Sequence, residues 1–433
     1  MKRSQAMAVP LPSGTRYFRT HLRLHIGQAA FFVLSLALVL GGCAAGGLQQ
    51  ASSPDVVGLS SDRLKDISTA FMAGVDKKEI PGAVILIARH GKIGYFEAFG
   101  YRDRETGAPM NRDAIFRIAS MTKPVTIVAA MTLIEQGRLN LSDPVSRHLP
   151  EFADVKVGVE KKDAAGKLVL VLETPHREMT VLDLMRHTSG ITYDFTGKSL
   201  VRERYNQEKI RDPGMNNAMF VSRLSRAPLQ NHPGEVWDYS FSTDVLGRIV
   251  EVISGMELEQ YFAERIFKPL GMADTGFWVS DVAKQSRIAE VQADAATGKR
   301  PATSDKTTRS WQSGGGALVS TASDYARFCQ MLLNGGELDG ARIISRKSVE
   351  QMTQNHLPEG IKINHFPIPV LDVRLEAGNG FGLNLMVRTA DGRGPIPGNI
   401  GDYTWPGIFG TQFWVDPKKE LVVVMMKIGR AHV

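Results

Sequence analysis

The stretch RIASMTKPV, residues 117–125, carries Ser120 and Lys123 three residues apart. A serine hydroxyl is a poor nucleophile until a neighbouring base takes its proton. A lysine three residues further along a helix lies on the same face as the serine, within reach of a hydrogen bond. The spacing therefore predicts a serine–lysine pair of a nucleophilic enzyme.

Pro124 indicates where this pair lies on its helix. Proline is tolerated only in the first helical turn, so Ser120 should lie at or just before the helix start. There the helix N-terminus adds positive potential and a free backbone N–H near the hydroxyl. In isolation, however, an N-cap serine followed by a solvated Lys123 is the favoured interpretation, because a chain of this length produces about one Ser-x-x-Lys match by chance.

Further segments change this interpretation. GEVWDYSFSTDVLGRIVEVISG, residues 234–255, contains Tyr239, and YTWPGIFGTQFWVDPKKELVVVMM, residues 403–426, contains Trp-Pro-Gly at residues 405–407. With LMRHTSGI (184–191) and GGGALVSTASDYARF (314–328), they resemble the penicillin-binding-protein and class C β-lactamase superfamily of serine hydrolases. Within it the chain is most similar to the family VIII carboxylesterases, from about residue 60 to residue 427.

The resemblance implies a role for each matching residue. Ser120 matches the nucleophile and Lys123 its partner lysine. Tyr239 matches the tyrosine of the second motif, which acts as the general base or shares that role. The backbone N–H groups of Ser120 and Ile408 would form the oxyanion hole.

Two positions distinguish the esterases from the β-lactamases of this superfamily. A class C β-lactamase has a lysine where this chain has Trp405, and Trp405-x-Gly407 matches the esterase form of the third motif. It also has an asparagine where this chain has Phe241. The loss of a charge-assisted hydrogen bond costs about 1.5–3 kcal/mol, and the loss of a neutral one about 1 kcal/mol. We therefore expect Trp405, Gly407 and Phe241 to bind neutral carboxylic esters with short acyl chains.

Three rival functions stay open at this stage. A β-lactamase or D,D-peptidase is disfavoured by Trp405 and Phe241. An acyltransferase would pass the acyl group to an alcohol and would use the same acyl-enzyme. A non-catalytic binding lipoprotein would keep the fold without the chemistry. For the esterase we expect a small-molecule ester as partner and a monomer as the assembly.

Other catalytic chemistries lack their motifs. The chain has no Gly-x-Ser-x-Gly sequence, which argues against the nucleophile elbow of an α/β-hydrolase. No zinc-type spacing of His, Cys and carboxylates is apparent, so we expect no metal and no cofactor. His187 invites a Ser–His interpretation, but the family has no catalytic histidine there, and we predict a structural turn residue.

Strand patterns lie at both ends of the chain and helical patterns between them. Residues 61–76 have apolar residues at helical spacing, and residues 82–103 are typical of two strands joined at His90-Gly91. Further helices are expected at residues 120–136, 180–187, 243–253, 257–267 and 321–334. Further strands are expected at residues 380–387, 407–416 and 420–427.

This order predicts an α/β (α+β), β-lactamase-like fold: an antiparallel sheet flanked by helices, plus an inserted all-helical domain, with the site at their junction. We expect the sheet domain to comprise residues 58–112 and 318–433, and the helical domain residues 113–317. Residues 421–426 are apolar on both faces, as a strand covered on both sides should be. The superfamily continues into a C-terminal helix, so we expect the sequence to be a fragment that ends before it.

The N-terminal segment predicts export and lipidation. Residues 1–42 form a basic leader that ends in an apolar run too short to be a comfortable membrane span, which is typical of a secretory signal peptide. Its end resembles the lipobox of bacterial lipoproteins, in which Cys43 is lipidated. The alternative is an ordinary signal peptide cut near Ala45. Residues 43–57 would then form a flexible tether. Since Ala44 and not Asp follows the cysteine, we expect the periplasmic side of the outer membrane.

The net charge of +7 does not indicate nucleic-acid binding. Five of these charges lie in residues 1–42, which contain no acid, so the rest of the chain carries +2. No basic cluster with interleaved aromatic residues follows, and we expect no nucleic-acid partner. Cys329, the only other cysteine, lies in a helical pattern and should be a buried free thiol without a disulfide.

Overall fold

The fold is that of a computed structural model, which describes residues 48–212, 214–292, 306–307, 311–364, 378–391 and 397–429. Residues 45–433 form one compact unit. The predicted signal peptide and Cys43 lie outside the described residues, so the export and lipidation stay predictions. Within the described part of the chain, no helix is both long enough and apolar enough to cross a membrane.

A nine-stranded sheet is built from the two ends of the chain. Its order is β1-β3-β2-β17-β16-β15-β14-β13, with β4 beside β3. All neighbours are antiparallel except the two-residue strand β1, which runs parallel to β3. The predicted split antiparallel sheet is therefore confirmed. The strands are β1 (Gln49–Gln50), β2 (Gly82–Arg89), β3 (Lys92–Asp103), β4 (Ala108–Pro109), β13 (Asn379–Phe381), β14 (Met386–Arg388), β15 (Tyr403–Thr404), β16 (Gln412–Asp416) and β17 (Leu421–Lys427).

Strand β2 lies between a strand from the N-terminal part of the chain, β3, and one from the C-terminal part, β17. It forms the predicted hairpin with β3, and His90 and Gly91 in the turn both have a positive φ, 52° and 72°. Two such residues match the twist of a two-residue hairpin turn. The other edge of β2 pairs with β17 along its whole length.

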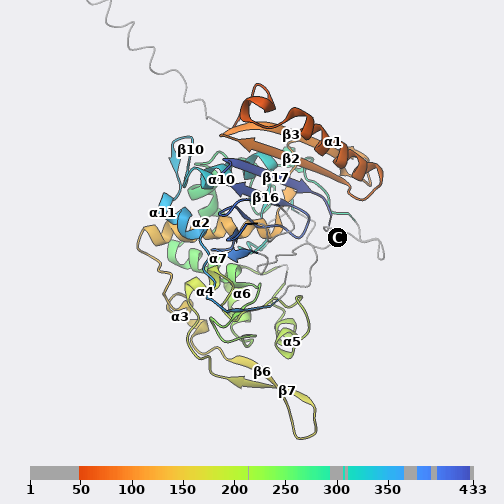
Figure 1. The fold of residues 1–433 in the computed structure, drawn as a ribbon. Helices are drawn as coiled ribbons and strands as arrows, with labels where there is room; N and C mark the ends of the chain where they lie inside the picture. Colours follow the sequence, from red (N-terminus) through yellow and green to blue (C-terminus); the bar gives the residue numbers. More distant parts are fainter. Residues whose placement is uncertain are drawn as a thin grey trace, which may run out of the picture. The chain divides into compact units, whose positions relative to one another are not determined.

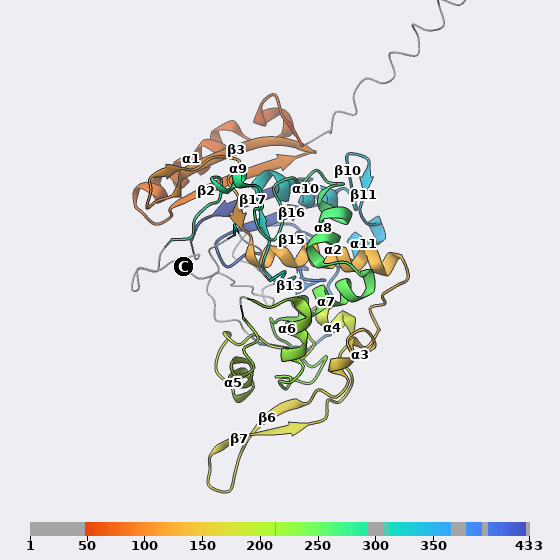
Figure 2. The ribbon, with the colours of Figure 1, turned by 180° about the vertical axis from the view of Figure 1, so that it is seen from behind.

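The two faces of the sheet are covered to different extents. Helix α1 (Ser61–Asp76) lies on one face, and helices α2 (Thr122–Glu135) and α10 (Ala322–Leu333) lie on the other side, as Figures 1 and 2 show. In β17 every second residue, beginning at Val422, is buried, whereas the residues that face α1 are only half-buried. The strand is thus fully covered on one face and partly covered, by α1, on the other.

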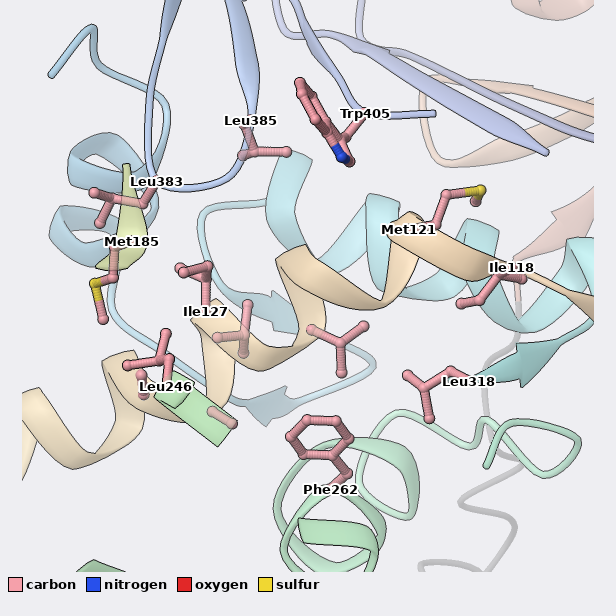
Figure 3. Close-up of a cluster of buried hydrophobic side chains, with 14 of the residues drawn as sticks. Ile118, Met121, Ile127, Met185, Leu246, Phe262, Leu318, Leu383, Leu385 and Trp405 are labelled. Atoms are coloured by element: carbon pink, nitrogen blue, oxygen red, sulfur yellow. The ribbon is translucent and has the colours of Figure 1, made fainter. Parts of the chain in front are cut away.

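Helix α2 is the centre of the largest core cluster. Its residues from Thr122 to Leu133 are all buried, so the helix is enclosed on every side, as expected for a helix that is apolar all round. Figure 3 shows Ile127 of this helix among side chains such as Leu246 and Phe262, which come from neighbouring helices. This packing fixes the start of α2, where the Ser-x-x-Lys sequence lies.

The helices predicted at residues 180–187 and 243–253 form as α4 and α7, whereas α3, α5, α6, α9 and α11 were not predicted. The predicted helix at 257–267 is divided into α8 and a π-helical turn, Ala263–Phe267. The other helices are α3 (Val145–His148), α4 (Val181–Met185), α5 (Leu200–Gln207), α6 (Asn217–Leu224), α7 (Ser242–Ser254), α8 (Leu258–Phe262), α9 (Val282–Gln285) and α11 (Arg346–Met352), with 3₁₀ turns at Pro54–Val57, Ala119–Met121 and Pro150–Phe152.

Two strand predictions need correction, and one hairpin was not predicted. Residues 380–387 do not form one strand, because Asn384 has a φ of 55° and turns the chain between β13 and β14. The predicted strand 407–416 begins with a turn, and only Gln412–Asp416 is extended. Sequence patterns also missed the hairpin of β6 (Val157–Lys162) and β7 (Leu168–Glu173), which extends from the helical part in Figures 1 and 2.

Three further two-stranded sheets are short. They pair β5 (Phe116–Arg117) with β9 (Val319–Ser320), β8 (Val236–Trp237) with β12 (Lys362–Ile363), and β10 (Glu337–Leu338) with β11 (Ala341–Arg342). The pairing of β5 with β9 holds the residues just before Ser120 against the residues that follow the glycine-rich segment 314–316. The division into a sheet domain and a helical domain stays a prediction.

Candidate active site

Ser120 lies in the 3₁₀ turn Ala119–Met121 that leads directly into α2. Its neighbours Ala119 and Met121 are buried, whereas Ser120 itself is partly exposed. Ala119 has a φ of 45°, a left-handed conformation that is strained for a residue with a side chain and that typically occurs at functional sites. Ser120 makes no capping hydrogen bond to α2, which contradicts the interpretation as an ordinary N-cap serine.

Lys123 is fully buried and its amine has three neighbours with oxygen atoms. The Nζ atom lies 3.5 Å from Ser120 Oγ, 3.0 Å from the Tyr193 hydroxyl and 2.6 Å from the Gly315 carbonyl oxygen. The interpretation as a solvated surface lysine is therefore wrong. The fold instead holds the buried amine of Lys123 beside Ser120, which is partly exposed.

Tyr239 also lies beside Lys123, as its place in the second motif predicts. Its side chain is 3% exposed, and the Lys123 Nζ lies 4.6 Å from the centre of its ring. The indole N–H of Trp405 donates a hydrogen bond to the Tyr239 hydroxyl at 3.3 Å. The second and third motifs, 166 residues apart in sequence, thus meet at this phenol.

Tyr193 is a site residue that the sequence analysis missed. Its hydroxyl accepts the hydrogen bond from Lys123, and its ring packs edge-on against Tyr239 with the centres 5.2 Å apart. Burial raises the pKa of the Tyr193 phenol well above its ordinary value, and the neighbouring Tyr239 and Asp244 act in the same direction. Tyr193 follows the segment LMRHTSGI by two residues, which is the only signal in the sequence that could have indicated it.

The glycine-rich segment around Gly315 is held by a buried carboxylate. Asp244 accepts hydrogen bonds from the Ser313 hydroxyl and from the Gly315 N–H at 3.1 Å. A Cβ atom on Gly315 would lie 2.3 Å from an Asp244 oxygen, so only glycine fits here. Burial raises the pKa of the Asp244 carboxyl, while Lys123 and these two hydrogen bonds act against that rise. The carbonyl of Gly315 is thereby aimed at the lysine.

The third motif approaches the nucleophile through its glycine. The Gly407 N–H donates to the Thr411 carbonyl at 2.7 Å, and a Cβ atom on Gly407 would lie 2.4 Å from the Ile118 carbonyl oxygen. The next residue, Ile408, begins a turn. Among the described residues, no backbone carbonyl accepts a hydrogen bond from the Ile408 N–H.

The two predicted apolar walls are packed inside the protein. Trp405 is fully buried against Tyr239, and Phe241, 3% exposed, packs edge-on against Tyr193 with the ring centres 4.4 Å apart. Phe195, in contrast, is 45% exposed, and its ring stacks on Tyr193. Direct contact of Trp405 or Phe241 with a substrate stays a prediction.

His187 lies behind Tyr239 and is fully buried. Its Nδ1 atom lies 3.2 Å from the Ser240 hydroxyl, and the residue has a φ of 59°. Burial lowers the pKa of His187 well below its ordinary value, and the nearby Lys123 acts in the same direction. Its position in a turn and its partner agree with a structural role.

The described residues contain no group of three or more His, Cys, Asp or Glu side chains that could hold a metal ion. Cys329 lies on α10 as a buried free thiol, as predicted, and burial raises its pKa well above the ordinary value.

Comparison with known proteins agrees with this geometry. The family model described as Beta-lactamase matches residues 67–427, so the chain belongs to the β-lactamase family of serine hydrolases. Protein Rv1367c of Mycobacterium tuberculosis is 38% identical over 361 residues, which cover 80% of this chain and 85% of that protein. Esterase EstB of Burkholderia gladioli is 37% identical over 215 residues, which cover 49% of this chain and 50% of the esterase.

A solved structure extends the likeness to the fold. EstCE1, described as a hydrolase with promiscuous acyltransferase activity, superposes with a TM-score of 0.70 at 27% sequence identity. The match covers 85% of this chain and 94% of that one. The chain is thus a hydrolase of the β-lactamase fold, as its motifs predict.

Proposed function

We propose that this protein hydrolyses neutral carboxylic esters with short acyl chains through an acyl-enzyme on Ser120. The observation that carries the proposal is the buried amine of Lys123 beside the partly exposed Ser120 hydroxyl. The similarity to an esterase and to a hydrolase with promiscuous acyltransferase activity supports it.

The hydrogen bonds of Lys123 suit a base that takes the serine proton. A neutral amine has two N–H bonds and one lone pair. If the two N–H bonds point to Tyr193 and to the Gly315 carbonyl, the lone pair is left for the Ser120 hydroxyl. Ser120 then attacks the ester carbonyl while its proton passes to the pair of Lys123 and Tyr239.

The oxyanion would be held by two backbone groups. We assign this role to the N–H groups of Ser120 and Ile408, and the lack of a carbonyl partner for the Ile408 N–H within the described residues supports the assignment. The alcohol leaves with the proton, and a water molecule activated by the same pair hydrolyses the acyl-enzyme. Removal of one such donor lowers kcat by about 10²–10³-fold in related chemistry.

An acyltransferase is the second candidate, because relatives described as acyltransferases also match. Acyltransferase mokF of Monascus pilosus is 34% identical over 224 residues, half of this chain. Both activities share the acyl-enzyme, so they differ only in whether water or an alcohol accepts the acyl group. A β-lactamase or D,D-peptidase is disfavoured because Trp405 and Phe241 provide neither the charge nor the amide that binds a lactam.

A side-by-side assay tests the proposal. Purified protein receives a chromogenic short-chain ester and a chromogenic cephalosporin, and product analysis with added alcohol detects acyl transfer. We expect a higher kcat/KM for the ester, and loss of that activity in Ser120→Ala with an unchanged melting temperature. Faster cleavage of the cephalosporin would assign a β-lactamase instead, and full activity of Ser120→Ala would exclude this nucleophile.

We further propose that the protein is a lipoprotein anchored through Cys43 on the periplasmic side of the bacterial outer membrane. The lipobox-like sequence supports this proposal. In the full chain, Cys43→Ser should move the protein from the membrane fraction to the soluble fraction. An equal distribution of the two forms would contradict the proposal.

A further inference from the structure

Arg202 lies in the first turn of α5, is 8% exposed and touches both segments that bring a tyrosine to Lys123. Its Nε atom donates to the Tyr193 carbonyl at 3.2 Å, and its Nη2 atom donates to the Thr192 hydroxyl at 2.9 Å. The same Nη2 atom lies 3.8 Å from a carboxylate oxygen of Asp238, the residue before Tyr239.

Asp238 is tied to the rest of the site in its own right. Its N–H donates to the His187 carbonyl at 2.9 Å, and its carboxylate accepts a hydrogen bond from the Asn231 side chain at 3.2 Å. Burial raises the pKa of the Asp238 carboxyl, and the guanidinium of Arg202 acts against that rise. The charge of Arg202 therefore helps to keep a buried carboxylate ionised beside the catalytic tyrosine.

Stability alone does not account for such a pair. A buried ion pair gains little over well-packed apolar side chains of similar volume, because both charges lose their water. The planar fork of arginine, in contrast, fixes several acceptors in one geometry, which lysine cannot do. Here the acceptors belong to the two segments whose phenols surround one amine.

We propose that Arg202, paired with Asp238, is a positioning residue that sets the distances of the Tyr193 and Tyr239 phenols from Lys123, and through them the proton transfer from Ser120. It acts on the geometry of the site and not on the substrate, since the described contacts of its guanidinium are all to protein groups: the Tyr193 carbonyl, Thr192, Asp238, Ser199 and Gln230. The inference rests on the proposed function, because proton transfer from Ser120 is the step that it serves.

Variants that separate charge from geometry test the proposal: Arg202→Met, Arg202→Lys and the double variant Arg202→Met/Asp238→Asn. Arg202→Met leaves Asp238 unpaired, so we expect a melting temperature about 5–10 °C lower. The misplaced phenols should lower kcat by about 10–100-fold, with KM changed less than about threefold. Arg202→Lys keeps the charge but not the fork and should lie between wild type and Arg202→Met.

The double variant gives the decisive outcome. Removing both charges should restore the melting temperature to within about 2 °C of wild type, whereas kcat should stay low because the contacts to Tyr193 and Thr192 are still missing. The acidic limb of the pH profile of kcat/KM should also be displaced. Recovery of kcat together with stability would overturn the proposal and leave Arg202 a structural role only.

Two controls complete the experiment. Arg327→Met breaks the ion pair of Arg327 with Asp339, in which the arginine is 13% exposed, and should lower the melting temperature without changing kcat. If wild type is no more active than Ser120→Ala, the proposed function fails. Crystal structures of the variants then test the positioning role of Arg202 without an activity assay. We expect the distance from Lys123 Nζ to the Tyr193 hydroxyl to exceed 3.5 Å in the double variant. An unchanged distance would overturn the proposal.

Discussion

Two segments bring a tyrosine to Lys123, and they do so by different means. Tyr239 directly follows the short strand β8 and the buried Asp238, and its hydroxyl receives a hydrogen bond from Trp405. Tyr193 lies in a loop without helix or strand, and its hydroxyl receives the hydrogen bond of Lys123 itself. A hydroxyl that accepts a hydrogen bond from the lysine thus belongs to Tyr193, which lies outside the recognisable motif.

The difference suggests separate tasks for the two phenols. The raised pKa of Tyr193 keeps its proton in place, which suits a residue that orients the lysine amine. Tyr239, with the lysine over its ring and the indole N–H on its oxygen, is the better candidate for sharing the transferred proton. The following substitutions test this division.

Lys123→Ala should have the largest effect, because it removes the amine that both tyrosines serve. We expect kcat for a chromogenic ester to fall at least about 10²-fold, as for loss of a general base. Circular dichroism should show an intact fold. A variant that keeps near-full activity would mean that Lys123 takes no part in the proton transfer.

Tyr239→Phe should follow, again with a loss in kcat of at least about 10²-fold, because the ring remains but the hydroxyl that shares the proton is gone. The shape of the pH profile of kcat/KM should change as well as the maximal value of kcat/KM. If Tyr239→Phe retains nearly full activity, the assignment of the second motif is wrong.

Tyr193→Phe should be milder, since it removes one hydrogen bond that orients Lys123. The loss of about 1 kcal/mol corresponds to a decrease in kcat of about 5–10-fold. Tyr403→Phe is the matched control, because the buried Tyr403 hydroxyl has no hydrogen-bond partner among the described residues. If Tyr193→Phe lowers kcat as much as Tyr239→Phe does, the tasks of the two phenols are assigned the wrong way round.

Phe195→Ala should have the smallest effect. This exposed ring stacks on Tyr193, and the guanidinium of Arg211 lies over the ring, 5.1 Å from its centre. We expect KM to rise about 3–10-fold through loss of an aromatic contact, with kcat unchanged. A fall in kcat as large as that of Tyr193→Phe would show that the stack, and not the hydroxyl, orients the lysine.

Much of the fold could be predicted from local patterns. Helix α1 and the hairpin of β2 and β3 have the predicted bounds, because apolar spacing and turn residues act over a few positions. The strand prediction failed at residues 380–387, where Asn384 turns the chain. The hairpin of β6 and β7 was missed because its pattern lies between helices and its strands form a sheet apart from the nine-stranded one.

The sequence by itself determined the family, the spacing of Ser120 and Lys123 and the order of the three motifs, since these depend on residue identity and on contacts along one helix. Only the tertiary structure decided which groups complete the site. Tyr193, Gly315 and Arg202 reach Lys123 or its tyrosines through contacts across 70 or more residues, or through a loop with no repeating pattern. Such neighbours follow from how buried surfaces pack, which spacing along the chain does not specify.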